Sequence, residues 1–169
     1  MRKLALISLL LLAVVALAAC GGGGSGSSGG GSTSGGSAAE ENTAASPEAA
    51  WAQEITALMN EFENKVSADL TEQIHTSTSR QHLEPLYSTY STNLSVLANK
   101  LEDTEAKGAC VAVRKKMVDD VRRVAALTKT LTDQSHLSPE QYAAKAYQQG
   151  LKIERLGHHL GGLVAEPKC

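Results

Sequence analysis

From residue 46 onward, apolar residues recur every three or four positions in four separate segments, and none of these segments alternates with a period of two. Spacings of three and four place side chains on one face of an α-helix. Ser46-Pro47-Glu48 opens the first segment with a capping serine, a proline suited to the first helical position and a carboxylate for the positive helix end. We expect this helix to end in the polar run 76–79. Its stripe is formed by Trp51, Ile55, Leu58, Phe62, Val66, Leu70 and Ile74.

The second segment begins near Gln81 and has a spacing close to a heptad seam. We expect Pro85 in its first turn, where a missing N–H costs little. A break falls within 103–108, and the sequence leaves open whether Thr104 caps the next helix or Gly108 ends the previous one. The stripe consists of Leu83, Tyr87, Tyr90, Leu94, Leu97 and Leu101.

Two further stripes predict the third and fourth helices. The fourth helix is expected to start at Ser138-Pro139-Glu140-Gln141, where the serine and glutamine can form a capping box. We expect this helix to fray or end at Gly161-Gly162. The third stripe is Cys110, Val113, Met117, Val121, Val124, Thr128 and Leu131, and the fourth is Tyr142, Ala146, Ile153, Leu156, Leu160 and Leu163.

Together these segments predict an all-α fold. Four amphipathic helices of similar length with short connections favour a four-helix up-down-up-down bundle. Residues 46–169 are enough for one core and not for two. None of the four helices is apolar all round, so we expect none of them to span a membrane.

The first 19 residues have the pattern of an export signal. Arg2 and Lys3 precede an apolar run over 4–17 that is shorter than the roughly 20 residues of a membrane span. The sequence Leu17-Ala18-Ala19-Cys20 then resembles the processing site of a bacterial lipoprotein signal; a general signal peptidase site is the alternative. The resemblance implies that Cys20 becomes the first residue, carries diacylglycerol and fatty chains such as palmitate, and anchors the protein to the extracytoplasmic face of the cell membrane.

Residues 20–45 follow the expected cleavage site and consist almost entirely of Gly, Ser, Ala and Thr. Such a segment lacks the apolar residues that offset the entropy of folding, so we expect a disordered linker that spans about 28 Å. The tract resembles those of actinobacterial lipoproteins in style. The helical domain itself resembles no family that we recognise.

Lipidation of Cys20 would leave two cysteines, Cys110 and Cys169, in an export context that permits disulfides. In antiparallel helices, the start of the third helix lies beside the end of the fourth. We therefore predict a Cys110–Cys169 disulfide that closes a loop of about 60 residues and stabilises the fold by roughly 4 kcal/mol. The alternative is a buried Cys110 with a free Cys169.

The formal net charge of −2 becomes about −4 once Arg2 and Lys3 are removed. This balance argues against nucleic acid as a partner and against general adhesion to anionic lipid. The third helix is rich in Lys and Arg, whereas the first is rich in Glu and Asp. We interpret both as solvated faces with i,i+4 pairing; a basic stripe for an anionic partner such as a cell-wall polymer is the alternative.

The histidines raise the question of a metal site. Glu72 and His75 match one half of a di-iron bundle motif, but the other helices offer no second Glu-x-x-His element, so we expect neither a ferritin-like site nor a cofactor. His75, His82 and His136 are all expected at the end of the bundle away from the linker. Metal or small-ligand binding there is the alternative function.

The chain contains no HExxH sequence, phosphate loop or nucleophile–base spacing. Matches to Gly-rich motifs in the linker lack the flanking strand and helix that such motifs require. We therefore expect a binding module and not an enzyme. The partners we expect are an envelope protein or a cell-wall polymer. A filled bundle interior would favour recognition at the surface, and a hollow one would favour ligand transport.

Overall fold

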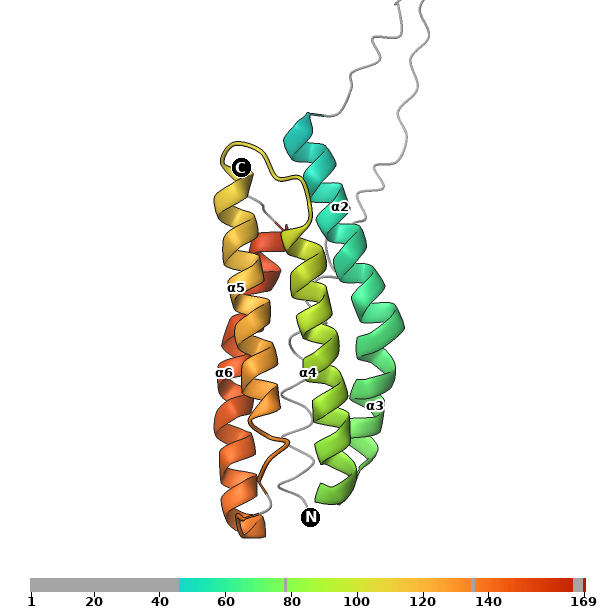
Figure 1. Ribbon diagram of the computed structural model, residues 1–169, viewed down its shortest axis with the longest axis vertical. Coiled ribbons are helices and arrows are strands. Elements are labelled where there is room, and N and C mark those ends of the chain that lie inside the picture. Colours follow the sequence, from blue (N-terminus) through green and yellow to red (C-terminus); the bar gives the residue numbers. More distant parts are fainter. Residues whose placement is uncertain (1–45, 78, 135, 166–168) are drawn as a thin grey trace, which may run out of the picture.

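The computed structural model describes residues 46–77, 79–134, 136–165 and 169, so the expected signal peptide, the linker and Cys20 lie outside the described residues. The described part is helical and contains no strand, which confirms the all-α class. In Figure 1 the helices lie lengthwise along one another, with α4 between α5 and the helices α2 and α3, and with α6 behind α5. The elements are α2 (Pro47–Phe62), η2 (Glu63–Ser67), α3 (Ala68–Thr76), α4 (Arg80–Glu102), α5 (Cys110–Lys129) and α6 (Pro139–Ala165).

In the part of the chain that the structure describes, no helix combines the length and apolar content that crossing a membrane requires.

Two helix starts follow the predicted capping chemistry. The Ser46 hydroxyl accepts a hydrogen bond from the Ala49 N–H at 3.2 Å, with Pro47 at the first helical position. At the start of α6, the Ser138 hydroxyl accepts from the Gln141 N–H at 3.3 Å, and the Ser138 N–H donates to Gln141 Oε1 at 3.0 Å. This reciprocal pair is the capping box, which satisfies two backbone donors that the helix itself leaves free.

The elements α2, η2 and α3 follow one another without a break over 47–76, and we call them together the first rod; it differs from the regular helix that its stripe predicts. Its middle turn, η2, is a π-helix, in which one extra residue per turn shifts the register of everything that follows. As a result Ser67, and not Val66, takes the buried position in this turn. Val66 is displaced to the side of the rod, so its predicted place in the core is wrong.

The start of α4 corrects the position of Pro85. The Ser79 hydroxyl accepts from the His82 N–H at 3.3 Å, so the helix begins at Arg80 and Pro85 is its sixth residue, beyond the first turn. Proline has no N–H, so the Gln81 carbonyl lacks its usual partner one turn later. Both residues are exposed, which leaves that carbonyl accessible to water.

The connection between α4 and α5 resolves the choice that the sequence left open, and neither alternative holds. The Thr104 hydroxyl does not cap α5: it donates at 2.8 Å to the Leu101 carbonyl in the last turn of α4, and it accepts from Trp51 Nε1–H at 3.0 Å. Gly108 has φ +55°, a left-handed conformation that glycine adopts without strain, but it lies in the turn before α5. The first rod is thereby hydrogen-bonded to the α4–α5 connection.

Helix α6 continues through Gly161 and Gly162 to Ala165, so the predicted fraying point is wrong. Leu160 is buried just before the glycines, and Leu163 and Val164 pack against the core just after them. Each glycine costs a helix only about 1 kcal/mol relative to alanine. Burial of the neighbouring leucine and valine side chains outweighs that cost.

The core is built mainly from aliphatic side chains of α4, α5 and α6, with Trp51 and Ile55 added from α2. Among its members, Leu101, Met117, Val121, Leu131 and Ile153 are at most 1% exposed. Helices α4 and α5 are also joined by a buried hydrogen bond, in which the Ser91 hydroxyl donates to the Ala125 carbonyl at 2.9 Å.

Three tyrosines are buried in two different surroundings. Burial raises the pKa of Tyr142 to about 12, with the Glu84 carboxylate as a smaller cause, and burial likewise raises the pKa of Tyr87. Tyr90 faces the first rod, where its ring centroid lies 6.1 Å from that of Phe62. Burial is also the main reason why the pKa of Tyr90 is raised.

Candidate functional site

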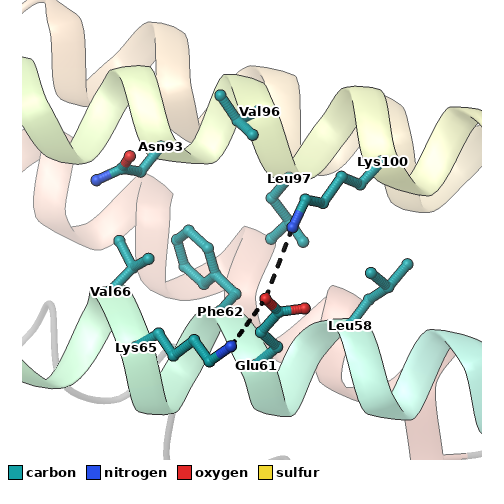
Figure 2. Close-up of a pocket in the computed structure, with 9 residues that line it drawn as sticks. All are labelled: Leu58, Glu61, Phe62, Lys65, Val66, Asn93, Val96, Leu97 and Lys100. Carbon is teal, nitrogen blue, oxygen red and sulfur yellow. Dashed lines mark hydrogen bonds and ion pairs between the residues drawn. The ribbon is translucent and has the colours of Figure 1, made fainter.

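Two hollows lined by described residues lie at the surface, in the seams between neighbouring helices. The first lies between the first rod and α4 and has a volume of about 110 Å³. Figure 2 shows Glu61 between two lysines, with its carboxylate 3.3 Å from Lys65 Nζ and 3.8 Å from Lys100 Nζ. Both lysines on its rim therefore share one carboxylate, which leaves the rim with a single excess positive charge. The apolar lining is Leu58, Phe62, Val66, Val96 and Leu97.

The second hollow lies in the seam between α5 and α6, and we call it the basic groove. It is open and shallow, with a volume of about 460 Å³. Its floor is apolar, and three cations stand around it. None of the three forms a salt bridge with a described residue. The floor is Ala126, Leu127 and Leu156, and the cations are Arg123, Lys152 and Arg155.

A buried ionisable pair lies beside the basic groove in the same seam. The Asp120 carboxylate on α5 is only 6% exposed and is hydrogen-bonded to Nδ1 of the half-exposed His159 on α6. Asp120 precedes Arg123 by three residues, and His159 follows Leu156 by three. In two antiparallel helices, this places the pair about one turn from the groove. Asp120 is therefore already paired, whereas the exposed Asp119, one turn before Arg123 on α5, forms no salt bridge with a described residue.

The bundle is electrically polarised from side to side. The first rod carries six carboxylates and one lysine, whereas α5 and α6 together carry nine Lys or Arg residues and four carboxylates. In Figure 1 the first rod and α5 lie on opposite sides of α4. The i,i+4 pairing predicted for these faces occurs in the first rod, at Glu61 and Lys65, but no described pair of that spacing lies within α5. For α5 that prediction is wrong.

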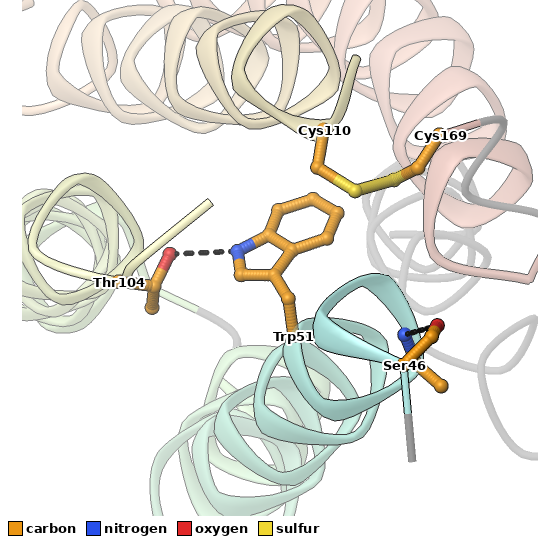
Figure 3. The surroundings of a disulfide bond; sticks show 6 residues. Ser46, Trp51, Thr104, Cys110 and Cys169 are labelled. Carbon is orange, nitrogen blue, oxygen red and sulfur yellow. Dashed lines mark hydrogen bonds between the residues drawn. A yellow bond between two sulfur atoms is a disulfide. The ribbon is translucent and has the colours of Figure 1, made fainter. Parts of the chain in front are cut away.

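The two remaining cysteines meet at the end of the bundle where α2 begins. The Cys110 and Cys169 sulfur atoms are at disulfide distance, 2.05 Å, and their Cα atoms are 4.6 Å apart. Figure 3 shows Trp51 beside this bond, with its indole N–H directed at Thr104. Cys110 is fully buried. This bond holds Cys169 against the first turn of α5 and so stabilises this end of the bundle.

The three histidines predicted at the end of the bundle away from the linker are described only in part. His82 and His136 are exposed, and the side chain of His75 lies outside what the structure describes. Within the described ranges, no group of three or more His, Cys, Asp or Glu side chains is arranged to hold a metal ion. Metal or ligand binding at this end stays a prediction.

Sequence reasoning found the cations of α5 but missed the basic groove. The groove exists only because residues 123–127 of α5 lie against residues 152–156 of α6, and this register depends on the lengths of the helices and of the 130–138 connection. Lys152, Arg155 and Leu156 at spacings of three and four were the available signal. They mark a helix face with both cationic and apolar residues.

Comparisons with protein-family models, with curated proteins and with solved structures find no match to this chain.

Proposed function

We propose that this chain is a lipid-anchored protein of the extracytoplasmic membrane face whose helical bundle binds an envelope partner through its basic side. The anchor is assigned to Cys20 on the residues of its signal alone. The binding role is supported by one observation above all: the cations around the basic groove have no acidic partner in the described chain.

Charge and packing both favour recognition at the surface. The described core is built mainly of aliphatic side chains, and both hollows described above open at the surface. Unpaired cations beside exposed apolar atoms are a poor way to stabilise a monomer, because neither group gains a partner on folding. They become favourable when a partner supplies anionic and apolar groups together.

The anchor and the binding role are tested separately. Intact-mass analysis of protein extracted from host membranes should show cleavage before Cys20 and the added mass of a diacylglycerol and fatty chains. An unmodified mass in the soluble fraction would contradict the anchor.

For the binding role, chemical cross-linking in intact cells should capture a component with the native chain, and Arg123→Gln/Lys152→Gln/Arg155→Gln should lose it. A matched variant that removes three cations elsewhere, Lys65→Gln/Lys100→Gln/Lys107→Gln, should retain it. Equal capture by both variants would show that the basic groove is not the binding surface.

A further inference from the structure

We infer that the basic groove docks the bundle onto anionic phospholipid at the membrane surface. This inference rests on the proposed function for the tether, because lipidated Cys20 would hold the bundle beside such a surface. The positive charge of the basic groove is compatible with any anionic partner, and the inference specifies which one binds there.

The apolar floor selects a membrane over a soluble polyanion. Leu127, Leu156 and Ala126 expose carbon atoms between the cations. A phosphate-bearing wall polymer or a polysaccharide would cover these atoms with polar groups and gain nothing from them. The boundary between headgroups and acyl chains offers phosphate oxygens and hydrocarbon within a few ångströms of each other, which is the combination that the groove presents.

The Lys and Arg side chains around the groove are long enough to contact lipid phosphates while the apolar floor meets hydrocarbon. Lys and Arg carry their charge at the end of an apolar stem, so the stems of Arg123, Lys152 and Arg155 can lie along the floor while their charges meet phosphates. Each such charge near an anionic surface is worth about a fivefold increase in binding constant. Three of them give roughly a hundredfold.

The tether places the groove within reach of the membrane. Helix α6 has 27 residues and is therefore about 40 Å long, and the groove lies near its middle, about 20 Å from the end of the bundle where the linker attaches. If residues 20–45 form the coil that their composition predicts, with a span of about 28 Å, they would allow the bundle to lie along the surface without being stretched. Tethering also turns docking into an intramolecular event, so a weak site suffices.

The overall negative charge of the mature chain does not prevent this docking. The carboxylates of the first rod lie across α4 from α5 (Figure 1), about two helix diameters, or roughly 20 Å, away. At physiological salt, charges farther apart than about 8 Å are largely screened. A membrane at the basic groove therefore meets the local positive charge and only a small part of the distant negative charge.

The experiment uses the whole mature chain with Cys20→Ser, so that vesicle binding depends on the groove and not on an acyl anchor. Sedimentation with phosphatidylglycerol-containing vesicles at physiological salt, where the distant carboxylates are screened, should show binding, and pure phosphatidylcholine vesicles should show none. Arg123→Gln/Lys152→Gln/Arg155→Gln should lower the partition coefficient about a hundredfold. The control Lys65→Gln/Lys100→Gln/Lys107→Gln has the same net charge and should lower it less than tenfold.

A second variant tests the floor. Ala126→Glu places a carboxylate at an exposed position between the cations and should also abolish binding. Circular dichroism and thermal unfolding of every variant establish that the bundle is folded.

Several results would overturn the inference. These are no binding to anionic vesicles, equal losses in the groove variant and its control, or soluble polyphosphate binding as tightly as vesicles, which would make the partner a polyanion. Association of the chain with itself that the groove variant abolishes would make the partner a second copy. The protein used here carries no acyl chain, so a failure to bind vesicles would not contradict the proposed lipid anchor. Conversely, finding the native protein without lipid would not change the result of the vesicle experiment.

Discussion

The first rod has a predicted stripe of seven residues, and so does α5 when Leu131, two residues past its end, is included, but the two stripes differ in period. Six steps along the α5 stripe, from Cys110 to Leu131, cover 21 residues, whereas six steps from Trp51 to Ile74 cover 23. Six turns of an α-helix need about 21.6 residues. The α5 stripe therefore fits a regular helix, and the first stripe is too long by about one residue. The π-helical turn at Glu63–Ser67 accommodates that residue.

The first rod and α5 also differ in the fraction of their residues that is buried. Helix α5 buries nine of its 20 residues, whereas the first rod buries four of 30: Trp51, Ile55, Ser67 and Ile74. Fewer buried contacts mean a smaller free energy of local opening. The comparison teaches that an amphipathic stripe predicts which face turns inward but not how firmly that face is attached.

The largest effect is expected from single-residue deletions that test the register of the two elements. Deleting exposed Lys115 from α5 rotates the buried residues on one side of the deletion by about 100°, off the core. Since burying one such side chain is worth about 1.5–3 kcal/mol, the free energy of unfolding should fall by about 5 kcal/mol. Deleting exposed Asn64 from η2 converts the π turn into a regular one and should cost less than about 2 kcal/mol.

Urea unfolding of the two deletion variants measures this difference. Equal losses would mean that the π turn does not act as an inserted residue, and the comparison between the rods would fail.

The next effect concerns Trp51, which fixes the first rod to the rest of the bundle. Trp51→Ala removes a side chain that is 2% exposed together with its hydrogen bond to Thr104, and should cost about 3–5 kcal/mol. Trp51→Phe keeps most of the volume and should cost about 1–2 kcal/mol. Hydrogen exchange should show that Trp51→Ala removes protection mainly from residues 47–76. Uniform loss across α4 and α5 would contradict a separately attached first rod.

The disulfide gives α5 a support that the first rod lacks. Its two cysteines are 59 residues apart, so the chain-entropy model assigns it about 4 kcal/mol, and measured values are commonly 2–4 kcal/mol. Cys110→Ala and the double variant should lose the same stability, because Cys110→Ala alone removes the whole bond; Cys169→Ala should lose slightly less, because the buried Cys110 side chain remains. Denatured, unreduced protein that carries Cys20→Ser, and so retains two cysteines, should contain no free thiol. Additive losses or two free thiols would exclude the bridge.

The smallest effect lies in the alkaline pH range. Burial raises the folded-state pKa of Tyr87, Tyr90 and Tyr142, so their neutral form favours the folded state. Their contribution is complete below the unfolded-state pKa of about 10 and is lost as the pH rises above it toward the folded-state values. Because the Tyr90 ring packs against Phe62 of the first rod, Tyr90 should ionise first if that rod opens separately.

Tyrosinate absorbance, assigned with Tyr87→Phe, Tyr90→Phe and Tyr142→Phe, tests this order. Simultaneous ionisation of all three would indicate that the bundle unfolds as one unit.

Features that depend on residues close together in the sequence were predictable from it, and features that depend on how separate helices meet were not. The caps at Ser46 and Ser138 involve residues within three positions, and both were predicted correctly. The hydrogen bond from Trp51 to Thr104 crosses 53 positions and depends on how two rods meet, so no local pattern indicates it. The basic groove depends on the register between α5 and α6 in the same way. The π turn was within reach, because a run of four-residue steps from Leu58 to Ile74 is longer than an α-helix allows.

Trp51 lies beside the Cys110–Cys169 bond, so its fluorescence can report the state of that bond (Figure 3). The chain has a single tryptophan, so all indole fluorescence comes from this point. A disulfide next to an excited indole accepts an electron from it and quenches its emission. Brightening of the unlabelled protein will therefore report the breaking of that bond as it happens.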